Sequence, residues 1–521
     1  MFAAVAAKAQ VPSERESVGL PPDPKPIGLP PDPKPIALPP TPQWIVQPTG
    51  SAAAAEVKPT VQPSTPEPVR RRQTQAVRIA PVARADIAIE LADFVHAPAS
   101  GNAPLMTRIN FLFHAGDGSG RQFVNDMRGR IYAIRNGVLL PVPFLDVVAA
   151  RGLSVPAGEP SNSEVGLITF AFHPDFSRSG APGYGKFYTL HTEPADRMNS
   201  GQVPVFRGPK DPPHHNNVLV EWSVDPSNPD RIVPGSSREI LRLGAHSNDN
   251  GGGQLGFDPN LAPGNPDYGQ LYISVGDGGN TVWDNGKVEK YHLAQNMMSA
   301  FGKILRINPL RAGERPYSVP VSNPFLGRKD VLPEIWASGL RNPQRFSWDR
   351  GGAKQMLIAD IGQANVEEIN LGKPGANYGW GLYEGDFLVD HTNQNNLTPL
   401  PDPPAGFAFP VAVYGHAEGS AVTGGFVYRG KQVPELAGKY IFGDLGSGAL
   451  FAADAQSLEA GIRTPISRLR IFYHGAEAAN VAEAMLKSAR ADMRLGMGED
   501  GDIYVLTKSD GGIRKIVRHP R

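Results

Sequence analysis

The sequence predicts an all-β fold: a six-bladed β-propeller with four-stranded blades, preceded by a disordered proline-rich N-terminal segment. Three observations predict it. Composition changes near residue 85, helical periodicity is scarce beyond that point, and a glycine-led strand phrase recurs along the rest of the chain. We therefore expect a proline-rich linker over residues 1–85 and a propeller over residues 86–521.

The first 85 residues hold 18 of the 52 prolines and a tandem nine-residue repeat, GLPPDPKPI, at 19–27 and 28–36. Proline fixes φ and lacks an amide donor, so this composition favours extended polyproline II geometry over a sheet. It predicts a semi-rigid linker or stalk.

Strand patterns begin near Asp86 with the alternation of Ile87, Ile89 and Leu91. A glycine followed by an apolar-aromatic strand then recurs as GRIYAI (129–134), GKFYTL (185–190), GQLYIS (269–274), GAKQMLIAD (352–360), GKYIFG (438–443) and GDIYVL (501–506). Each interval leaves room for one four-stranded sheet, and six sheets around an axis make a propeller. Two packed sandwiches would require a linker near the middle of the chain, and the sequence shows none.

The composition excludes several classes of protein. Lysine plus arginine equals aspartate plus glutamate at 51 each, so no net field attracts nucleic acid. The chain has no cysteine, which excludes disulfides, thiolate metal sites and a cysteine nucleophile. No apolar run reaches eighteen residues, so we expect no membrane span. The opening MFAAVAAKAQ is either a truncated export signal or a disordered end, and we expect a periplasmic or secreted protein.

Nine phrases in a fixed order carry a resemblance to a known family. They are EVGLITFAFHPDF (164–176), GGGQLGFDP (251–259), LYISVGDGG (271–279), GKILRINP (302–309), GLRNPQRFSWD (339–349), ADIGQANVEEIN (359–370), NYGWGLYEG (377–385), VTGGFVYRG (422–430) and GKYIFGDLGSG (438–448). Over residues 86–520 the chain resembles the glucose/sorbosone dehydrogenase family. That family includes soluble sugar dehydrogenases that use pyrroloquinoline quinone (PQQ), and the propeller of Hedgehog-interacting protein.

The resemblance implies a propeller whose loops at one end hold PQQ and calcium. In the family's dehydrogenases a histidine takes the proton of the sugar C1 hydroxyl while the C1 hydride passes to the quinone, and calcium polarises the quinone carbonyl. The expected partners are an aldose sugar and an external electron acceptor, without nucleic acid. By resemblance, backbone carbonyls of Gly362 and Gln363 hold the calcium.

The stretch AHSNDNGGGQLGFDP (245–259) corresponds to the loop that carries the base in many dehydrogenase members. There the histidine stands three residues before the last glycine of the turn, a position that Asn250 occupies in this chain. An amide cannot take and hold a proton, and the nearest imidazole is His246. We expect the flexible glycines 251–253 to let His246 reach the site as the base; the alternatives are a lost base and a surface histidine without a role.

Other roles follow from the same resemblance. Arg341 is expected to stabilise negative charge and Asp277 to orient the base or hold sugar hydroxyls, although an ion pair of Arg341 with Asp349 and a turn-capping Asp277 remain open. The expected cofactor-binding residues are Asn342, Arg429, Glu164 and Asn250. Of these, Glu164 stands where some members have glutamine, and it either binds a hydroxyl or repels an anionic cofactor.

Two hypotheses of function remain. The first is an exported quinoprotein that oxidises an aldose at C1 to the lactone with PQQ and calcium. The second is a non-catalytic extracellular propeller that binds a saccharide or a protein with the same face; the displaced imidazole and the neutral segment GDLGSGALF (443–451) favour it.

Overall fold

The computed structural model describes residues 79–520 except 103–104, 154–163, 198–202, 209–211, 280–292, 391–395, 401–402 and 487–489. The opening MFAAVAAKAQ and the tandem repeat lie outside the described residues, as does most of the expected linker over 1–85. The first described strand, β1 (Ala83–His96), begins three residues before Asp86.

The prediction of an all-β fold is confirmed. In the described part of the chain, the single α-helix is the five-residue α1 (Val147–Arg151), which Asp146 caps by accepting a hydrogen bond from the Ala149 amide. Short 3-10 turns cover Pro434–Leu436 and Ala455–Ser457, and a π-turn covers Ala482–Leu486. None of these helices is long and apolar enough to cross a membrane.

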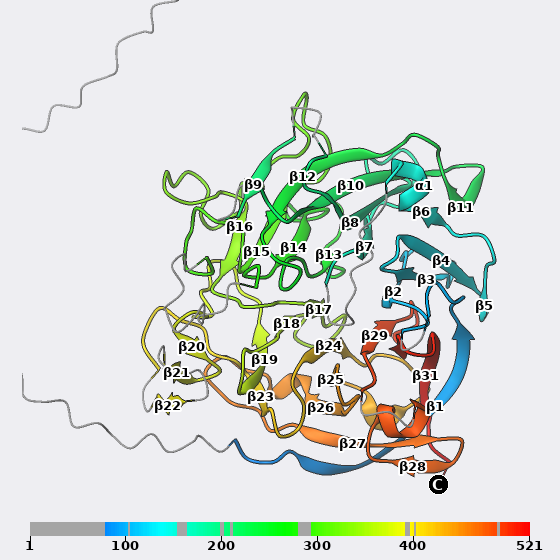
Figure 1. Cartoon of the computed structure of the whole chain (residues 1–521), viewed down its shortest axis with the longest axis vertical. Coiled ribbons are helices and arrows are strands. Elements are labelled where there is room, and N and C mark those ends of the chain that lie inside the picture. Colours follow the sequence, from blue (N-terminus) through cyan, green and yellow to red (C-terminus); the bar gives the residue numbers. More distant parts are fainter. Residues whose placement is uncertain are drawn as a thin grey trace, which may run out of the picture. The chain divides into compact units, whose positions relative to one another are not determined.

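The strands form runs of four antiparallel neighbours, in chain order (Figure 1). The first three runs are β2 (Ile109–His114), β3 (Gln122–Asp126), β4 (Arg130–Arg135) and β5 (Val138–Leu139); β7 (Leu167–Phe172), β8 (Lys186–Pro194), β10 (His215–Asp225) and β12 (Arg238–Ala245); and β13 (Leu255–Phe257), β14 (Leu271–Val275), β15 (Lys303–Ile307) and β16 (Ile335–Ser338). Three short strands flank them, namely β6 (Leu145–Asp146), β9 (Val205–Arg207) and β11 (Asn228–Ile232).

The later runs follow the same order. They are β17 (Arg345–Trp348), β18 (Met356–Asp360), β19 (Val366–Leu371) and β23 (Ala412–Gly415); β24 (Val422–Val427), β25 (Lys439–Asp444), β26 (Leu450–Asp454) and β27 (Ser467–Tyr473); and β29 (Met493–Met497), β30 (Ile503–Thr507), β31 (Gly512–Arg518) and β1. A separate three-stranded sheet holds β20 (Tyr383–Glu384), β21 (Phe387–Val389) and β22 (Leu397–Pro399), and β28 (Ala476–Ala478) pairs with β27.

The two ends of the described chain meet in one sheet. Strand β1 pairs antiparallel with β31, from Ile89 opposite Arg518 to His96 opposite Gly512, and parallel with β27 on its other side. In Figure 1 the blue β1 accordingly runs beside the orange β27 with its first half and beside the red β31 with its second half. Strand β1 therefore links the run that ends in β27 to the run that begins with β29.

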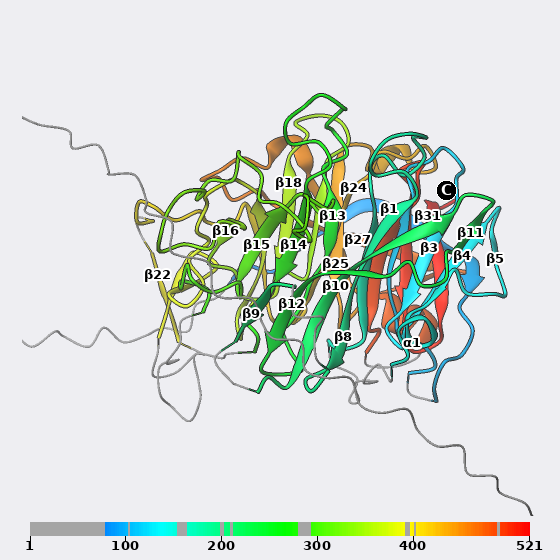
Figure 2. The ribbon, with the colours of Figure 1, turned by 90° about the horizontal axis from the view of Figure 1, so that it is seen from above.

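The first strands of successive runs lie against one another. Strand β2 contacts both β29 and β7, β7 contacts β13, and β24 contacts both β17 and β29. The step from β13 to β17 is made by Gln254, whose Nε2 donates to the Phe346 carbonyl at 2.7 Å and whose Oε1 accepts from the Phe346 amide at 3.2 Å. The six strands therefore form a closed circle of contacts, labelled around the centre of Figure 1; Figure 2 shows β13 and β24 of this circle from the side.

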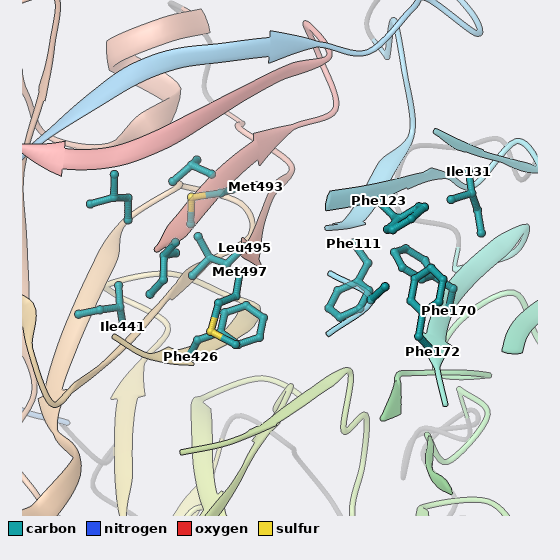
Figure 3. Packing of buried hydrophobic residues seen from close by; sticks show 14 of the residues in the cluster. Phe111, Phe123, Ile131, Phe170, Phe172, Phe426, Ile441, Met493, Leu495 and Met497 are labelled. Atoms are coloured by element: carbon teal, nitrogen blue, oxygen red, sulfur yellow. The ribbon is translucent and has the colours of Figure 1, made fainter. Parts of the chain in front are cut away.

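The recurring glycine-led phrase marks equivalent strands with one exception. Five copies form the second strand of a run, namely β8, β14, β18, β25 and β30, whereas GRIYAI forms β4, the third strand of its run. The core between neighbouring sheets is aromatic and aliphatic, and Figure 3 shows its Phe111, Phe123 and Phe170 packed near Ile131. Burial of each large apolar side chain contributes roughly 1.5–3 kcal/mol.

Candidate functional site

A polar cavity of about 350 Å³ lies where the first strands begin. Every run contributes to it at the start of its first strand or just before it: Asn110 of β2, Glu164 and Ile168 at β7, Asn250 and Gly252 before β13, Asn342 to Arg345 at β17, Ser420 and Ala421 before β24, and Arg490 to Arg494 at β29. Segments far apart in the sequence thus converge on one site, which we call the polar cavity.

The loop between β16 and β17 supplies Arg341 and Asn342. The Asp360 carboxylate holds its backbone, accepting from the Arg341 amide at 2.9 Å and the Asn342 amide at 2.6 Å. Burial raises the pKa of Asp360 to about 7, although both amides and the Arg341 charge lower it. The Arg341 guanidinium donates to Gln363 Oε1 and to the Ile361 carbonyl, both at 2.9 Å, and lies 5.7 Å from the centre of the Trp380 ring. The position of Arg341 is therefore fixed by residues other than Asp349.

An amide network connects Asn250, Asn342 and Glu164. Asn342 Nδ2 donates to Asn250 Oδ1 at 3.0 Å and to Glu164 Oε1 at 2.9 Å, and Gln344 Nε2 also donates to Glu164 Oε1 at 2.8 Å. The second carboxylate oxygen of Glu164, Oε2, is buried and has no hydrogen-bond partner in the described part of the chain. Glu164 therefore presents one engaged and one available oxygen.

Asp277 lies directly behind this network. Its Oδ1 accepts from Asn250 Nδ2 and its Oδ2 from Trp380 Nε1, both at 2.9 Å, and its amide donates to the Arg341 carbonyl at 2.7 Å. Burial raises the pKa of Asp277, against the Arg341 charge and these hydrogen bonds. Asp277 is not among the cavity-lining residues, and its hydrogen bond holds the amide of Asn250, which is.

Buried cations line the floor of the polar cavity. Arg345 donates to the carbonyls of Gln344 and Asn110, and Arg494 donates to Asn110 Oδ1 and its neighbour's carbonyl. Burial lowers the pKa of Arg345 to about 9, and repulsion by the Arg494 charge adds to this effect. Burial lowers the pKa of Arg494 to about 10. Both stay protonated at neutral pH. In the described part of the chain neither forms an ion pair with a carboxylate.

Lys508 lies beside these two arginines. It follows β30, is 2% exposed, and its Nζ has only the Met127 sulfur within hydrogen-bonding range, at 3.5 Å, in the described structure. Burial lowers the pKa of Lys508 well below its usual value, and the nearby guanidinium groups lower it further. A bound anion would favour the protonated form of Lys508 and offset the charges of Arg345 and Arg494, against the carboxylates of Glu164, Asp249 and Asp492 that also line the cavity.

The loop after β18 contains Gly362 and Gln363, both of which line the polar cavity. Glu384 Oε1 accepts from four consecutive amides of this loop, from Gln363 at 3.1 Å to Val366 at 3.0 Å. Convergent amides point the intervening carbonyls away from Glu384, as in a backbone nest. A Cβ on Gly362 would lie 1.8 Å from the Val366 carbonyl oxygen, so this turn requires glycine.

The structure brings together six of the nine residues that we expected at the site. Arg341, Asn342, Glu164, Asn250, Gly362 and Gln363 all line the polar cavity, and Asp277 lies behind them. The described residues contain no group of three or more histidine, aspartate and glutamate side chains that could hold a metal. A hard cation here would depend on carbonyl oxygens.

The structure does not place His246 and Arg429 at this cavity. His246 is 5% exposed, packs edge-on against Phe301 at 5.6 Å between ring centres, and is not among the cavity-lining residues. Asn250, which adopts a left-handed φ of 51°, lines the cavity in its place. Arg429 is held by a two-point ion pair with Asp349 at 2.7 and 2.8 Å, outside the cavity. It is therefore unavailable to a ligand bound there.

Sequence reasoning missed the cations of the cavity floor and Gln344. Arg345 and Gln344 lie within the phrase GLRNPQRFSWD, where the polar residues after Asn342 were a usable signal. Arg494 and Lys508 had none, because a cation at the edge of a strand normally faces water.

Comparison with known proteins gives consistent matches. A family model described as Glucose / Sorbosone dehydrogenase matches residues 112–518. The chain is 29% identical over 472 residues to the HIPL1 protein of Arabidopsis thaliana, covering 79% of this chain and 62% of that protein. It is 26% identical over 420 residues to the Hedgehog-interacting protein of Mus musculus, covering 78% and 50%. The chain thus spans about half to three fifths of the length of these relatives.

Among solved structures, the fold is similar to the PQQ-bound form of aldose sugar dehydrogenase from Streptomyces coelicolor. The TM-score is 0.51 at 19% identity, covering 82% of this chain and 97% of that one.

Proposed function

Because the chain belongs to the glucose/sorbosone dehydrogenase family, we propose that it is a quinoprotein that oxidises an aldose at C1 to the lactone and passes the electrons to an external acceptor. We propose also that its six runs of four strands are the six blades of a propeller, closed by β1. The polar cavity, at one end of the first strands, is then the site of PQQ, calcium and sugar.

The cations of the polar cavity carry this proposal. PQQ has three carboxylates, and bidentate arginine contacts are the strongest that proteins offer to such groups. The guanidinium groups of Arg341, Arg345 and Arg494 line one cavity beside Lys508, and in the described structure the hydrogen bonds of these four side chains go to neutral acceptors. This donor set fits the cofactor. The carbonyls of Gly362 and Gln363 would hold calcium, and bound PQQ would accept the hydride from C1.

The remaining chemistry belongs to the chain's own residues. Asn250 stands at the family's base position, but a side-chain amide cannot take and hold a proton, and the structure engages it with Asp277 and Asn342. Glu164 presents the unpartnered Oε2 beside that amide. We assign to Glu164 the acceptance of the sugar hydroxyl proton, while Asn342 and Gln344 hold its other oxygen in place.

A second candidate is a non-catalytic propeller that binds a saccharide or a protein at the same cavity. The specific observation in its favour is Asn250, because an imidazole is replaced by an amide with both polar atoms engaged. The similarity to Hedgehog-interacting protein agrees with it. For both candidates we propose a periplasmic or secreted location.

The two candidates separate in one assay. The purified chain is incubated with PQQ and calcium, and reduction of a dye acceptor is followed with a panel of aldoses. The quinoprotein proposal predicts dye reduction that Glu164→Gln lowers at least tenfold and that Arg429→Met, outside the cavity, leaves unchanged. Absence of dye reduction, together with a melting temperature that calcium raises and PQQ does not, would favour the binding propeller instead.

A further inference from the structure

A second cavity, of about 360 Å³, lies farther along the same first strands. In β2, β17 and β29 the residues Asn110, Arg345 and Arg494 line the polar cavity, whereas residues up to three places later, Phe113, Trp348 and Met497, line the second one. The two cavities adjoin along these strands and share no lining residue, since Phe111 and Phe346, which directly follow Asn110 and Arg345, line the second one. We call the second one the aromatic cavity.

The wall of the aromatic cavity is made of flat apolar side chains. Phe111 and Phe170 meet edge to face at 5.6 Å, and Phe426 lies 6.1 Å from Phe113 across the cavity wall. Figure 3 shows Phe111, Phe170 and Phe172 on one side and Phe426 with Met497 on the other. A cavity of this size and lining is suited to a small aromatic molecule, for which stacking and edge contacts are favourable.

One buried polar group interrupts this apolar wall. His114 is 7% exposed, and its Nε2 lies 3.2 Å from Nη1 of Arg350, another lining residue. A guanidinium group only donates, so Nε2 accepts and the ring hydrogen is on Nδ1. Burial lowers the pKa of His114 to about 3; Arg350 adds to the effect, and Asp117 and Asp500 oppose it. The ring is therefore neutral at physiological pH.

The hydrogen on Nδ1 has no acceptor in the described part of the chain. Nδ1 is buried, and its surroundings include Gly116, which also lines the cavity. A buried donor without a partner is costly, and in native structures such groups usually have an acceptor. Since His114 lines the cavity, a molecule bound there could supply this acceptor.

We propose that the aromatic cavity binds a flat aromatic molecule bearing a carbonyl or carboxylate oxygen, with that oxygen accepting the hydrogen bond of His114 Nδ1. The rings of Phe111, Phe170 and Phe426 contact its faces and edges. Arg350 stands at the exposed end of the cavity, where its charge favours the oxygen-bearing end of the ligand. This site is separate from the polar cavity and does not depend on PQQ.

Calorimetric titration of the full chain tests this with three probes of one size: 2-naphthoate, 1,4-naphthoquinone and naphthalene. We expect both oxygen-bearing probes to bind saturably at one site per chain, and naphthalene at least tenfold more weakly. In His114→Phe, which keeps the ring and removes the donor, the oxygen-bearing probes should lose about tenfold in affinity while naphthalene is unchanged. His474→Phe, at an exposed histidine, should bind all three like the wild type.

Arg350→Met distinguishes a carboxylate ligand from a neutral carbonyl ligand. Because Arg350 is exposed, its replacement does not put folding at risk. Weaker binding of 2-naphthoate alone identifies an aromatic acid as the favoured class, and unchanged binding of both identifies a neutral carbonyl such as a quinone. Melting temperatures without probe establish that each variant is folded. The proposal is overturned if neither oxygen-bearing probe saturates the wild type, or if folded His114→Phe binds them with wild-type affinity.

Discussion

Replacement of Lys508 by methionine tests the electrostatics of the polar cavity without any ligand. Methionine has a similar length and no charge, and it would lie beside the Met127 sulfur. The charged groups around Lys508 are Arg108, Arg345, Arg494 and Asp492, three cations against one anion. We expect Lys508 to be neutral in the folded apoprotein, because burial and the nearby guanidinium groups lower its pKa well below the usual value and its Nζ has no carboxylate partner in the described structure.

The sign and size of the effect follow from linkage. An unfolded lysine titrates near 10.4, so as pH falls below that value the unfolded chain gains a proton that the folded chain does not, and folding loses about 1.4 kcal/mol per pH unit. This loss continues down to the lowered pKa of folded Lys508. An unfolding entropy of about 2.1 cal/mol/K per residue over about 440 residues converts it to about 1.5 °C per pH unit.

Melting curves of the two apoproteins provide the assay. Between pH 8.5 and 6.5 the melting temperature of the wild type should fall by about 3 °C relative to Lys508→Met, because every other titrating group is common to both chains. The variant should also be the more stable of the two at pH 6.5. Parallel curves over this range would mean that Lys508 stays charged when buried, and the account of the cavity floor would be refuted.

Three further substitutions have defined outcomes. Gly362→Ala should reduce calcium affinity at least tenfold and lower the melting temperature, since the added Cβ would lie 1.8 Å from the Val366 carbonyl oxygen. Calorimetric titrations with calcium that match the wild type would contradict the structure of that loop. Asn250→His should raise the rate of aldose oxidation, because it places an imidazole where the wild type has an amide that cannot take a proton. An unchanged rate in stopped-flow assays would mean that Glu164 alone is a sufficient proton acceptor. The buried Glu193 forms ion pairs with Arg151 and Arg242, both at 2.8 Å. Burial raises the pKa of Glu193, yet its hydrogen bond with His191 and the charge of Arg151 lower it to about 2. Glu193→Gln should therefore cost about 3–5 kcal/mol above the ordinary glutamate pKa of 4.5, and less as pH falls toward 2; a chemical-denaturation difference below 1 kcal/mol at neutral pH would count against these ion pairs.

The strands and the site loops could be predicted largely from local sequence. Glycine-led apolar phrases identify strands because both the turn and the pleated, buried strand leave a short-range signature, as GKYIFG does for β25. Arg341 and Gly362 were found because they stand in loops directly after strands and match family phrases. Short-range pattern and resemblance sufficed for both.

The cavity floor could not be predicted, because it exists only after the sheets close on one another. Arg494 is the second residue of β29, and Lys508 directly follows β30. In the local sequence, neither position differs from an exposed strand end. The position of Arg429 was equally unpredictable: its phrase matches the family, but its side chain pairs with the Asp349 carboxylate outside the polar cavity. Pairings between residues about 80 apart in sequence depend on register and closure, which no local pattern specifies.

Equilibrium binding of PQQ to the apoprotein, with and without calcium, tests the central claim most directly. The account predicts one PQQ retained per chain, tighter with calcium than without it, with an affinity that falls at least tenfold in Arg494→Met and stays unchanged in Arg429→Met. Failure to retain PQQ in the presence of calcium, or equal affinities for these two variants, would contradict it.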